Sequence, residues 1–175
     1  INPGPWRLSH HHYGMLSYCK RLGVALEPFV QINHNAYVHS SKAFGGKPQR
    51  LRTVKADYQG HVAELLAKAT QGRALDAGVT AEDRARLLDS LRFWGALDKN
   101  YRYVKGEASA DMRGYARDPG GGLSGRPEFS EPVGLSDLLN SGLWAALPVG
   151  ELYDFQTTMF QPVGGMGRVG EAFAR

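Results

Sequence analysis

The spacing of hydrophobic residues predicts a first helix directly after Ser9, a residue type that often caps the start of a helix. Residues with helical spacing share one face of this segment: Leu8, His12, Met15, Cys19 and Leu22. Side chains three and four positions apart lie on one side of a helix, so we expect this face to be buried. Gly23 follows as a typical helix stop.

After this helix the pattern changes to that of short strands. Residues 26–32 and 36–39 are typical of extended segments, and the polar residues 33–35 between them favour a turn. The glycine pair at 45–46 indicates a second turn, and residues 50–54 a third strand. We therefore predict a small antiparallel meander packed against the first helix.

Two longer helices are predicted next. Residues 56–70 place a group of mostly apolar side chains on one side, namely Tyr58, Val62, Leu65, Leu66 and Ala69. Thr80 and Asp83 have the spacing of a capping box at the start of the second helix. The apolar stripe of that helix consists of Leu87, Leu88, Leu91 and Trp94. Such stripes are typical of ordinary core, and residues 72–78 connect the two helices.

The remaining chain is less regular. Residues 98–132 are rich in tyrosine, glycine and proline, with a long loop around 118–122, whereas 134–139 indicate a short helix. Together these elements predict an α+β fold with a small antiparallel sheet and a helical subdomain. We divide the chain into a helix with a β-meander (1–54), a helical subdomain with a long loop (55–150), and a return strand with the start of another helix (151–175).

Composition excludes several classes of protein. The net charge is +4 over 175 residues, but the basic residues are scattered, so we expect no nucleic-acid partner. No apolar run approaches the roughly 20 residues that cross a bilayer, so we expect a soluble protein without a membrane partner. Its compartment, cytoplasmic or secreted, stays open. The single cysteine, Cys19, excludes an internal disulfide and a cysteine-based zinc site. A chain that opens with Ile1 and has no signal peptide suggests a processed or truncated product.

The histidine triplet at 10–12 does not predict a metal site. Neighbouring helix residues point about 100° apart, so three in a row do not all chelate one ion. No spacing brings in the other histidines, and we predict no metal.

Two glycine patterns match the G-x-G-x-x-G dinucleotide fingerprint. The first, Gly120, Gly122 and Gly125, lacks the apolar strand before it and the helix after it. The second, Gly165, Gly167 and Gly170, fits better, because 159–163 favour a strand and 171–175 a helix. Pro162 disfavours a central strand, however, and no second strand or ribose-binding acid follows. We predict no dinucleotide site at either position.

The segment that ends in Arg7 carries the most chemistry. Pro3 and Pro5 restrict the backbone, and Gly4 removes a side chain where another group must come close. A stiff backbone followed by one arginine can present a guanidinium to a carboxylate or phosphate. The same residues also fit a simple turn with a solvated arginine, and the residues alone leave both readings open.

Several motifs resemble flavin-dependent L-amino acid oxidases of the flavin monoamine oxidase superfamily. They are residues 4–8 (Gly-Pro-Trp-Arg-Leu), 26–37, 115–123 and 160–166, the last with Gly164, Gly165 and Met166. The resemblance implies an internal, substrate-domain fragment of a larger FAD-linked amine-oxidase-type fold. It further implies that flanking FAD-binding segments or subunits complete the enzyme, which we expect to form a homo-oligomer.

The resemblance also implies roles for individual residues. Gly4, Pro5 and Trp6 would line the flavin ring, while Arg7 would both contact the cofactor and clamp the α-carboxylate of an L-amino acid substrate. Gly164, Gly165 and Met166 would form a turn beside the flavin, although Gly167 stands where the family usually has Asp. Tyr153 and Phe155 would wall the side-chain pocket.

The implied reaction is oxidative deamination of an L-amino acid to a 2-oxo acid, ammonia and hydrogen peroxide. No catalytic base is assigned, because residues 145–154 lack the histidine of snake-venom-type members. The family's cofactor-binding fingerprint is also missing, so we expect this chain alone to be inactive. A flavin amine oxidase and a non-catalytic α+β interaction module remain the alternatives.

Overall fold

The computed structural model describes residues 6–74, 78–120, 125–155 and 157–175. Its strands are β1 (Leu8–Ser9), β2 (Leu26–Pro28), β3 (Tyr37–Val38), β4 (Gln49–Arg50) and β5 (Met159–Pro162). Its helices are α1 (Tyr13–Arg21), α2 (Leu51–Gln71), α3 (Ala81–Trp94), α4 (Glu107–Arg113), α5 (Leu135–Ser141) and α6 (Gly167–Phe173). Short 3₁₀ segments occupy Phe44–Gly46, Leu143–Glu151 and Tyr153–Phe155. The predicted α+β class with small antiparallel sheets is confirmed.

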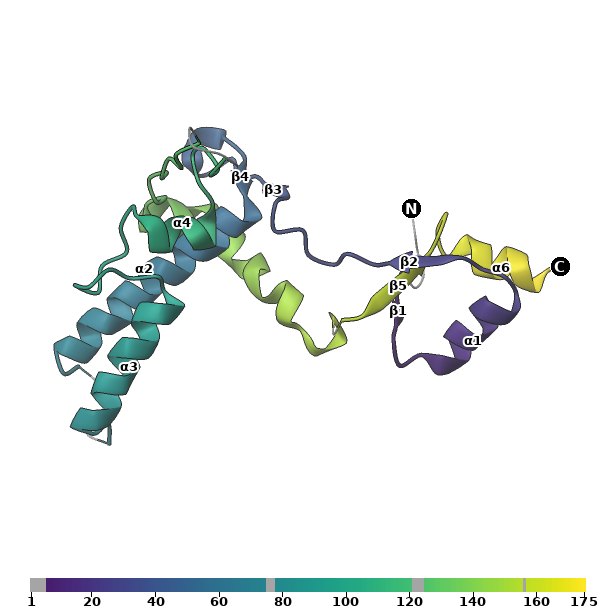
Figure 1. Ribbon diagram of the computed structural model, residues 1–175, viewed down its shortest axis with the longest axis horizontal. Coiled ribbons are helices and arrows are strands. Elements are labelled where there is room, and N and C mark those ends of the chain that lie inside the picture. Colours follow the sequence, from purple (N-terminus) through teal and green to yellow (C-terminus); the bar gives the residue numbers. More distant parts are fainter. Residues whose placement is uncertain (1–5, 75–77, 121–124, 156) are drawn as a thin grey trace. The chain divides into compact units, whose positions relative to one another are not determined.

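The chain forms two compact units (Figure 1). The sheet unit consists of Ile1–Asn33 and Pro148–Arg175, and the helical unit consists of His34–Leu147. The sheet unit therefore joins the two ends of the chain. The larger amine-oxidase-type fold stays a prediction.

The sheet unit contains a three-stranded antiparallel sheet with β5 between β1 and β2. Leu8 pairs with Phe160, and Pro28 pairs with the same residue from the other side. Leu8, Cys19 and Val169 are the buried core, which brings α1 and α6 against this sheet. Partly buried residues pack around them, namely Leu16, Val24, Leu26, Phe160 and Met166.

The predicted antiparallel meander is wrong. The strand at 26–28 pairs with β5, whereas β3 pairs with β4 in a separate two-stranded ladder. Residues 51–54, predicted as a strand, are the first turn of α2. A two-stranded hairpin alone is marginally stable, whereas inserting β5 between β1 and β2 gives a three-stranded sheet with an apolar face. Nothing in the local pattern revealed that distant partner.

The first helix begins later than predicted, at Tyr13 rather than after Ser9. Ser9 belongs to β1, and the His10 N–H donates to the Thr158 carbonyl, so the sheet occupies this backbone. The later start changes the buried face. Cys19 is buried as predicted and Leu16 packs beside it, but His12, Met15 and Leu22 are exposed.

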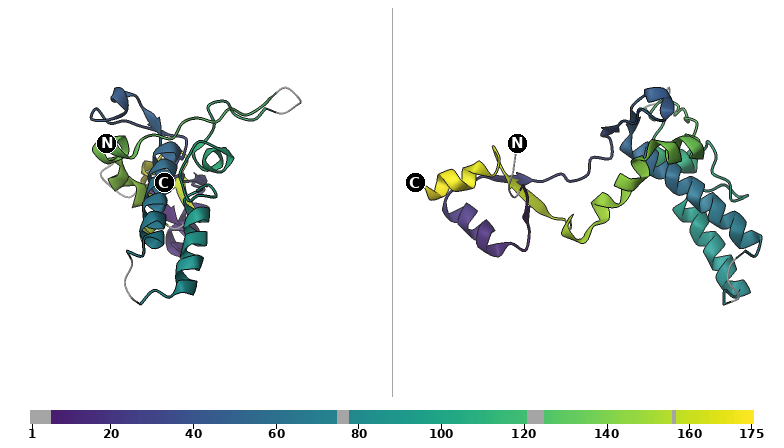
Figure 2. Two further views of the ribbon diagram at one scale, coloured as in Figure 1. Left: turned by 90° about the vertical axis from the view of Figure 1, so that its left-hand side faces the viewer. Right: turned by 180° about the vertical axis from the view of Figure 1, so that it is seen from behind.

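In the helical unit, α2 and α3 form an antiparallel pair (Figures 1 and 2). The predicted stripe of α2 is only partly correct, because Leu65 and Leu66 are 51% and 45% exposed. Small residues form the buried face instead, and Ala63 and Ala67 are completely buried. These small residues allow the backbone after α3 to lie close to α2. A Cβ added at Gly95, for example, would lie 2.2 Å from the Cβ of Ala63.

Several local predictions are confirmed. The Thr80 hydroxyl accepts the Asp83 N–H at 3.1 Å, and the Asp83 carboxylate accepts the Thr80 N–H at 3.3 Å, which completes the capping box. Leu91 is buried in the core with Leu87 and Leu88 packed against it, although Trp94 is half exposed. The predicted short helix at 134–139 is α5, and the strand at 159–163 is β5. Helix α4 was not predicted. Among the described helices, none combines the length and apolar character needed to cross a membrane.

Candidate functional site

Arg7 lies among aromatic rings of the sheet unit. Its guanidinium carbon is 4.6 Å from the ring centre of Phe155 and 5.7 Å from that of Trp6. Trp6 also contacts Phe29 edge to face, with ring centres 5.1 Å apart. A guanidinium placed over aromatic faces is held by cation–π attraction. The structure therefore brings together Trp6, Arg7 and Phe155, which the sequence analysis proposed as site residues.

The three-stranded sheet positions this cluster. Arg7 directly precedes β1, and Phe29 directly follows β2, where its N–H donates to the Met159 carbonyl at 2.9 Å. Phe155 lies shortly before β5. Because β5 pairs with both other strands, residues far apart in the sequence are held around one arginine.

The other predicted site residues are placed differently. The Tyr153 side chain is 91% exposed and does not join the ring contacts of the described residues. Gly164 and Gly165 have φ angles of +84° and +91°, a conformation that favours glycine, and they form the turn between β5 and α6. Met166 packs against the core that contains Leu8, the neighbour of Arg7. Gly4 and Pro5 lie outside the described residues.

A flavin dinucleotide has two parts that a protein must hold, a planar ring system and a pyrophosphate. Trp6, Phe29 and Phe155 place aromatic surface beside Arg7, and a planar ring can pack against such a surface. A cradle for the pyrophosphate is not found among the described residues. Gly165, Gly167 and Gly170 do follow a strand and open a helix, but β5 has antiparallel neighbours, unlike the parallel strand of a dinucleotide fold.

The first glycine fingerprint forms no cradle in its described part. The Gly120 N–H donates to the Gly125 carbonyl at 3.2 Å, and Arg117 pairs with Glu128 as in a narrow hairpin. Gly122 lies outside the described residues. Backbone N–H groups used in this way are not directed at a phosphate.

The histidine triplet shows no metal geometry. The rings of His10, His11 and His12 meet edge to face at 5.3 and 4.8 Å, and all three residues are exposed. Within the described ranges, no group of three or more histidine, cysteine or acidic residues is placed to share an ion.

A buried polar network in the helical unit was missed by the sequence analysis. Asp57, which is 0% exposed, accepts hydrogen bonds from Arg113 Nε at 2.6 Å and Arg113 Nη2 at 3.0 Å. Its carboxylate also accepts the Tyr103 hydroxyl at 2.7 Å and the Val133 N–H at 2.8 Å. Arg113 donates in addition to the backbone carbonyls of Ser130 and Glu131. The network therefore ties α2 and α4 to the loop that precedes α5.

This network serves structure rather than catalysis. Burial, followed by the charge of Asp57, raises the pKa of Tyr103 well above its ordinary value, so the phenol stays protonated. The partnership with Asp57 outweighs the effect of burial and raises the pKa of Arg113, so this guanidinium stays charged. Both carboxylate oxygens are engaged by protein donors. A signal for this pair exists in the sequence: Asp57 lies one helical turn before the small residue Gly60, on a side of α2 that is buried, and a carboxylate buried there needs a cation.

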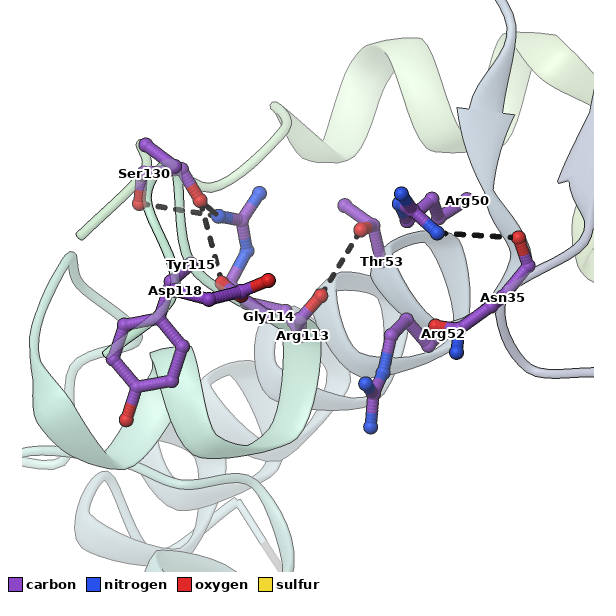
Figure 3. Close-up of a pocket in the computed structure, with 10 residues that line it drawn as sticks. Asn35, Arg50, Arg52, Thr53, Arg113, Gly114, Tyr115, Asp118 and Ser130 are labelled. Atoms are coloured by element: carbon purple, nitrogen blue, oxygen red, sulfur yellow. Dashed lines mark hydrogen bonds between the residues drawn. The ribbon is translucent and has the colours of Figure 1, made fainter. Parts of the chain in front are cut away.

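A polar cavity of about 540 Å³ opens beside this network (Figure 3). Arg50, Arg52 and Thr53, at the start of α2, form one side, and Asp118 and Ser130 lie across from them. No sequence motif indicated a ligand site at these residues.

A comparison with models of known protein families finds no family model that matches this chain.

Proposed function

We propose that this chain is part of an FAD-dependent L-amino acid oxidase in which Arg7 binds the α-carboxylate of the substrate. The observation that carries the proposal is the position of Arg7 over the ring of Phe155 and beside Trp6. The resemblance of residues 4–8, 26–37, 115–123 and 160–166 to that family supports it.

The geometry suits a carboxylate clamp. Stacking on a ring uses the flat face of a guanidinium, whereas a carboxylate binds along its N–H edge. The rings of Trp6 and Phe155 thus restrict the orientation of Arg7, and a bidentate ion pair needs a restricted orientation. They also exclude water from one side of the guanidinium, which strengthens its attraction for an anion.

Arg7 would position the substrate rather than perform the chemistry. When bound, FAD supplies two-electron oxidation of the substrate's carbon–nitrogen bond. Fixing the carboxylate leaves the α-carbon in one orientation, which lowers the entropic part of the barrier. The overall reaction consumes one amino acid, one dioxygen and one water, and yields a 2-oxo acid, ammonia and hydrogen peroxide. Flanking segments or subunits would hold the pyrophosphate, because the described residues form no cradle for it.

The test measures hydrogen peroxide formed from L-amino acids by the full-length natural polypeptide that contains this chain, supplied with FAD. Replacing Arg7 in Arg7→Gln should lower kcat/KM by about two to three orders of magnitude, since a buried carboxylate loses its partner. Arg21→Gln is the matched control, because Arg21 also lies over a ring, that of Tyr18 at 5.4 Å. It should leave kcat/KM unchanged.

Two outcomes contradict the proposal. Unchanged kcat/KM in Arg7→Gln would show that Arg7 does not bind the substrate carboxylate. Faster turnover of decarboxylated amines than of the parent amino acids would indicate an amine oxidase, which needs no carboxylate clamp. Absence of peroxide with either substrate class would favour the non-catalytic module.

A further inference from the structure

We propose that the polar cavity of the helical unit binds a small oxyanion, a carboxylate or phosphate group of a soluble ligand, through Arg52. The cavity lies entirely within the unit formed by His34–Leu147. Its volume of about 540 Å³ lies within the range of small-molecule sites. This inference is independent of the site around Arg7.

The three arginines of the cavity have different partners. Arg113 is neutralised by its bidentate pair with Asp57. Arg50 is exposed, lies over the ring of Tyr37 at 5.1 Å and donates to the Asn35 carbonyl at 3.4 Å. Neither interaction of Arg50 neutralises its charge.

Arg52 provides the main evidence that the cavity binds a ligand. Its Nε atom is buried and has no hydrogen-bond partner among the described residues. The Arg52 backbone N–H donates to the His34 carbonyl at 2.9 Å, which fixes the start of this side chain at the beginning of α2. A shielded guanidinium donor without an acceptor is costly, so a side-chain conformation in which Arg52 turns toward an oxyanion in the cavity would be favoured.

The charge balance of the cavity indicates what kind of hydrogen-bond acceptor it would bind. Arg50 and Arg52 contribute two positive charges and Asp118 one negative charge, while Arg113 is cancelled by Asp57. The net charge of the lining is therefore +1, which matches a singly charged oxyanion. The hydroxyls of Thr53 and Ser130 also line the cavity (Figure 3), but they already donate to the backbone carbonyls of Arg113 and Gly114, so the guanidinium groups of Arg50 and Arg52 carry the recognition. Planar guanidinium groups are typical partners of carboxylate and phosphate oxygens.

The test follows the Arg52 Nε–H signal by nitrogen–proton NMR in the full 175-residue chain. The signal is assigned by its disappearance in Arg52→Lys. Sodium phosphate and sodium acetate are titrated separately, with sodium chloride at equal ionic strength as the reference. We expect a saturable shift with one oxyanion or both, and the stronger of the two identifies the ligand class.

The matched variants are Arg52→Gln and Arg92→Gln, since Arg92 is exposed on α3 and does not line the cavity. Calorimetry should show affinity for the oxyanion weakened by about tenfold or more in Arg52→Gln, and unchanged in Arg92→Gln. Far-UV circular dichroism checks folding. If Arg52→Gln is unfolded, Arg50→Gln replaces it and should also weaken binding.

Two results would overturn the proposal. One is a shift of the Arg52 signal no larger than that caused by chloride. The other is equal affinity in the folded cavity variant and in Arg92→Gln, which would indicate nonspecific ion binding.

Discussion

The two compact units hold their central arginines in opposite ways. In the helical unit, Arg113 is 4% exposed and uses its N–H edge on Asp57 and on backbone carbonyls. In the sheet unit, Arg7 is partly buried and places its guanidinium over aromatic rings. An arginine whose edge is fully bonded within the protein serves stability, whereas stacking orients a guanidinium by its face. This difference separates a structural arginine from a candidate ligand-binding one.

The largest effect is expected from Asp57→Leu, which leaves Arg113 buried without its counter-charge. Removing one partner of a buried pair costs about 3–5 kcal/mol of unfolding free energy. Hydrogen exchange of single amides should show loss of protection in α2 and α4, while β5 in the sheet unit keeps its protection. The exposed pair Arg86–Glu82 provides the control, since Glu82→Gln should cost less than about 1 kcal/mol.

The double variant Asp57→Leu with Arg113→Leu sharpens this result. Removing Arg113 as well eliminates the unpaired buried charge, so part of the lost stability should return. The rest should stay lost, because the Tyr103 hydroxyl and the Val133 N–H still lack the acceptor that Asp57 provided. Equal loss of protection in both units would contradict the view that the network belongs to the helical unit alone.

A smaller effect is expected from Gly60→Ala on the buried face of α2. The added Cβ would lie 2.3 Å from ring carbons of Tyr103, so the ring must move and its bond to Asp57 is strained. Overpacking of this kind costs about 1–3 kcal/mol. Gly14→Ala in α1 is the control, because a Cβ there meets nothing within 4 Å and alanine favours a helix. Urea denaturation of both variants checks the prediction, and equal stability of the two would refute it.

Local signals in the sequence predicted local structure well. The capping box of Thr80 and Asp83 and the helix after Gly134 depend on residues close together in the chain. Leu65 and Leu66 misled the prediction for α2, because helix packing at short distance selects small residues over large ones.

Long-range partners could not be predicted in the same way. Asp57 and Arg113 are 56 positions apart, and β2 pairs with a strand near the other end of the chain. A polar residue on the buried face of a helix indicates that a hydrogen-bonding or charged partner is needed, but the local sequence does not show which residue that partner is. For the candidate site, the sequence singled out Trp6, Arg7 and Phe155, which the structure brings together, but it did not indicate the cavity beside Arg52.

A modest effect is expected when the rings around Arg7 are removed. Phe155→Leu abolishes the closest stack on the guanidinium and should lower the stability of the sheet unit by about 0.5–1 kcal/mol. The measurement is Trp6 fluorescence during urea unfolding, in a background that carries Trp94→Phe and Trp144→Phe. Tyr18→Leu removes the exposed stack on Arg21 and should have less effect. A loss in Phe155→Leu comparable to that of Asp57→Leu would show that Arg7 is also a structural arginine.

The smallest effect concerns the acid sensitivity of the helical unit. Burial alone would raise the pKa of Glu64, but hydrogen bonds from Lys68 Nζ at 2.5 Å and from the Tyr103 N–H at 2.7 Å outweigh it, so this pKa is lowered. A carboxyl whose pKa is lowered by folding stabilises the folded state above its unfolded pKa of about 4.3, and that stabilisation is lost as the pH falls further. Glu64→Gln should therefore destabilise the helical unit at pH 7 and differ less from the parent chain near pH 3. Thermal unfolding of the parent chain and of Glu64→Gln between pH 3 and pH 7 measures the difference in stability. A difference that is constant across this pH range would show that the charge of Glu64 contributes nothing to stability.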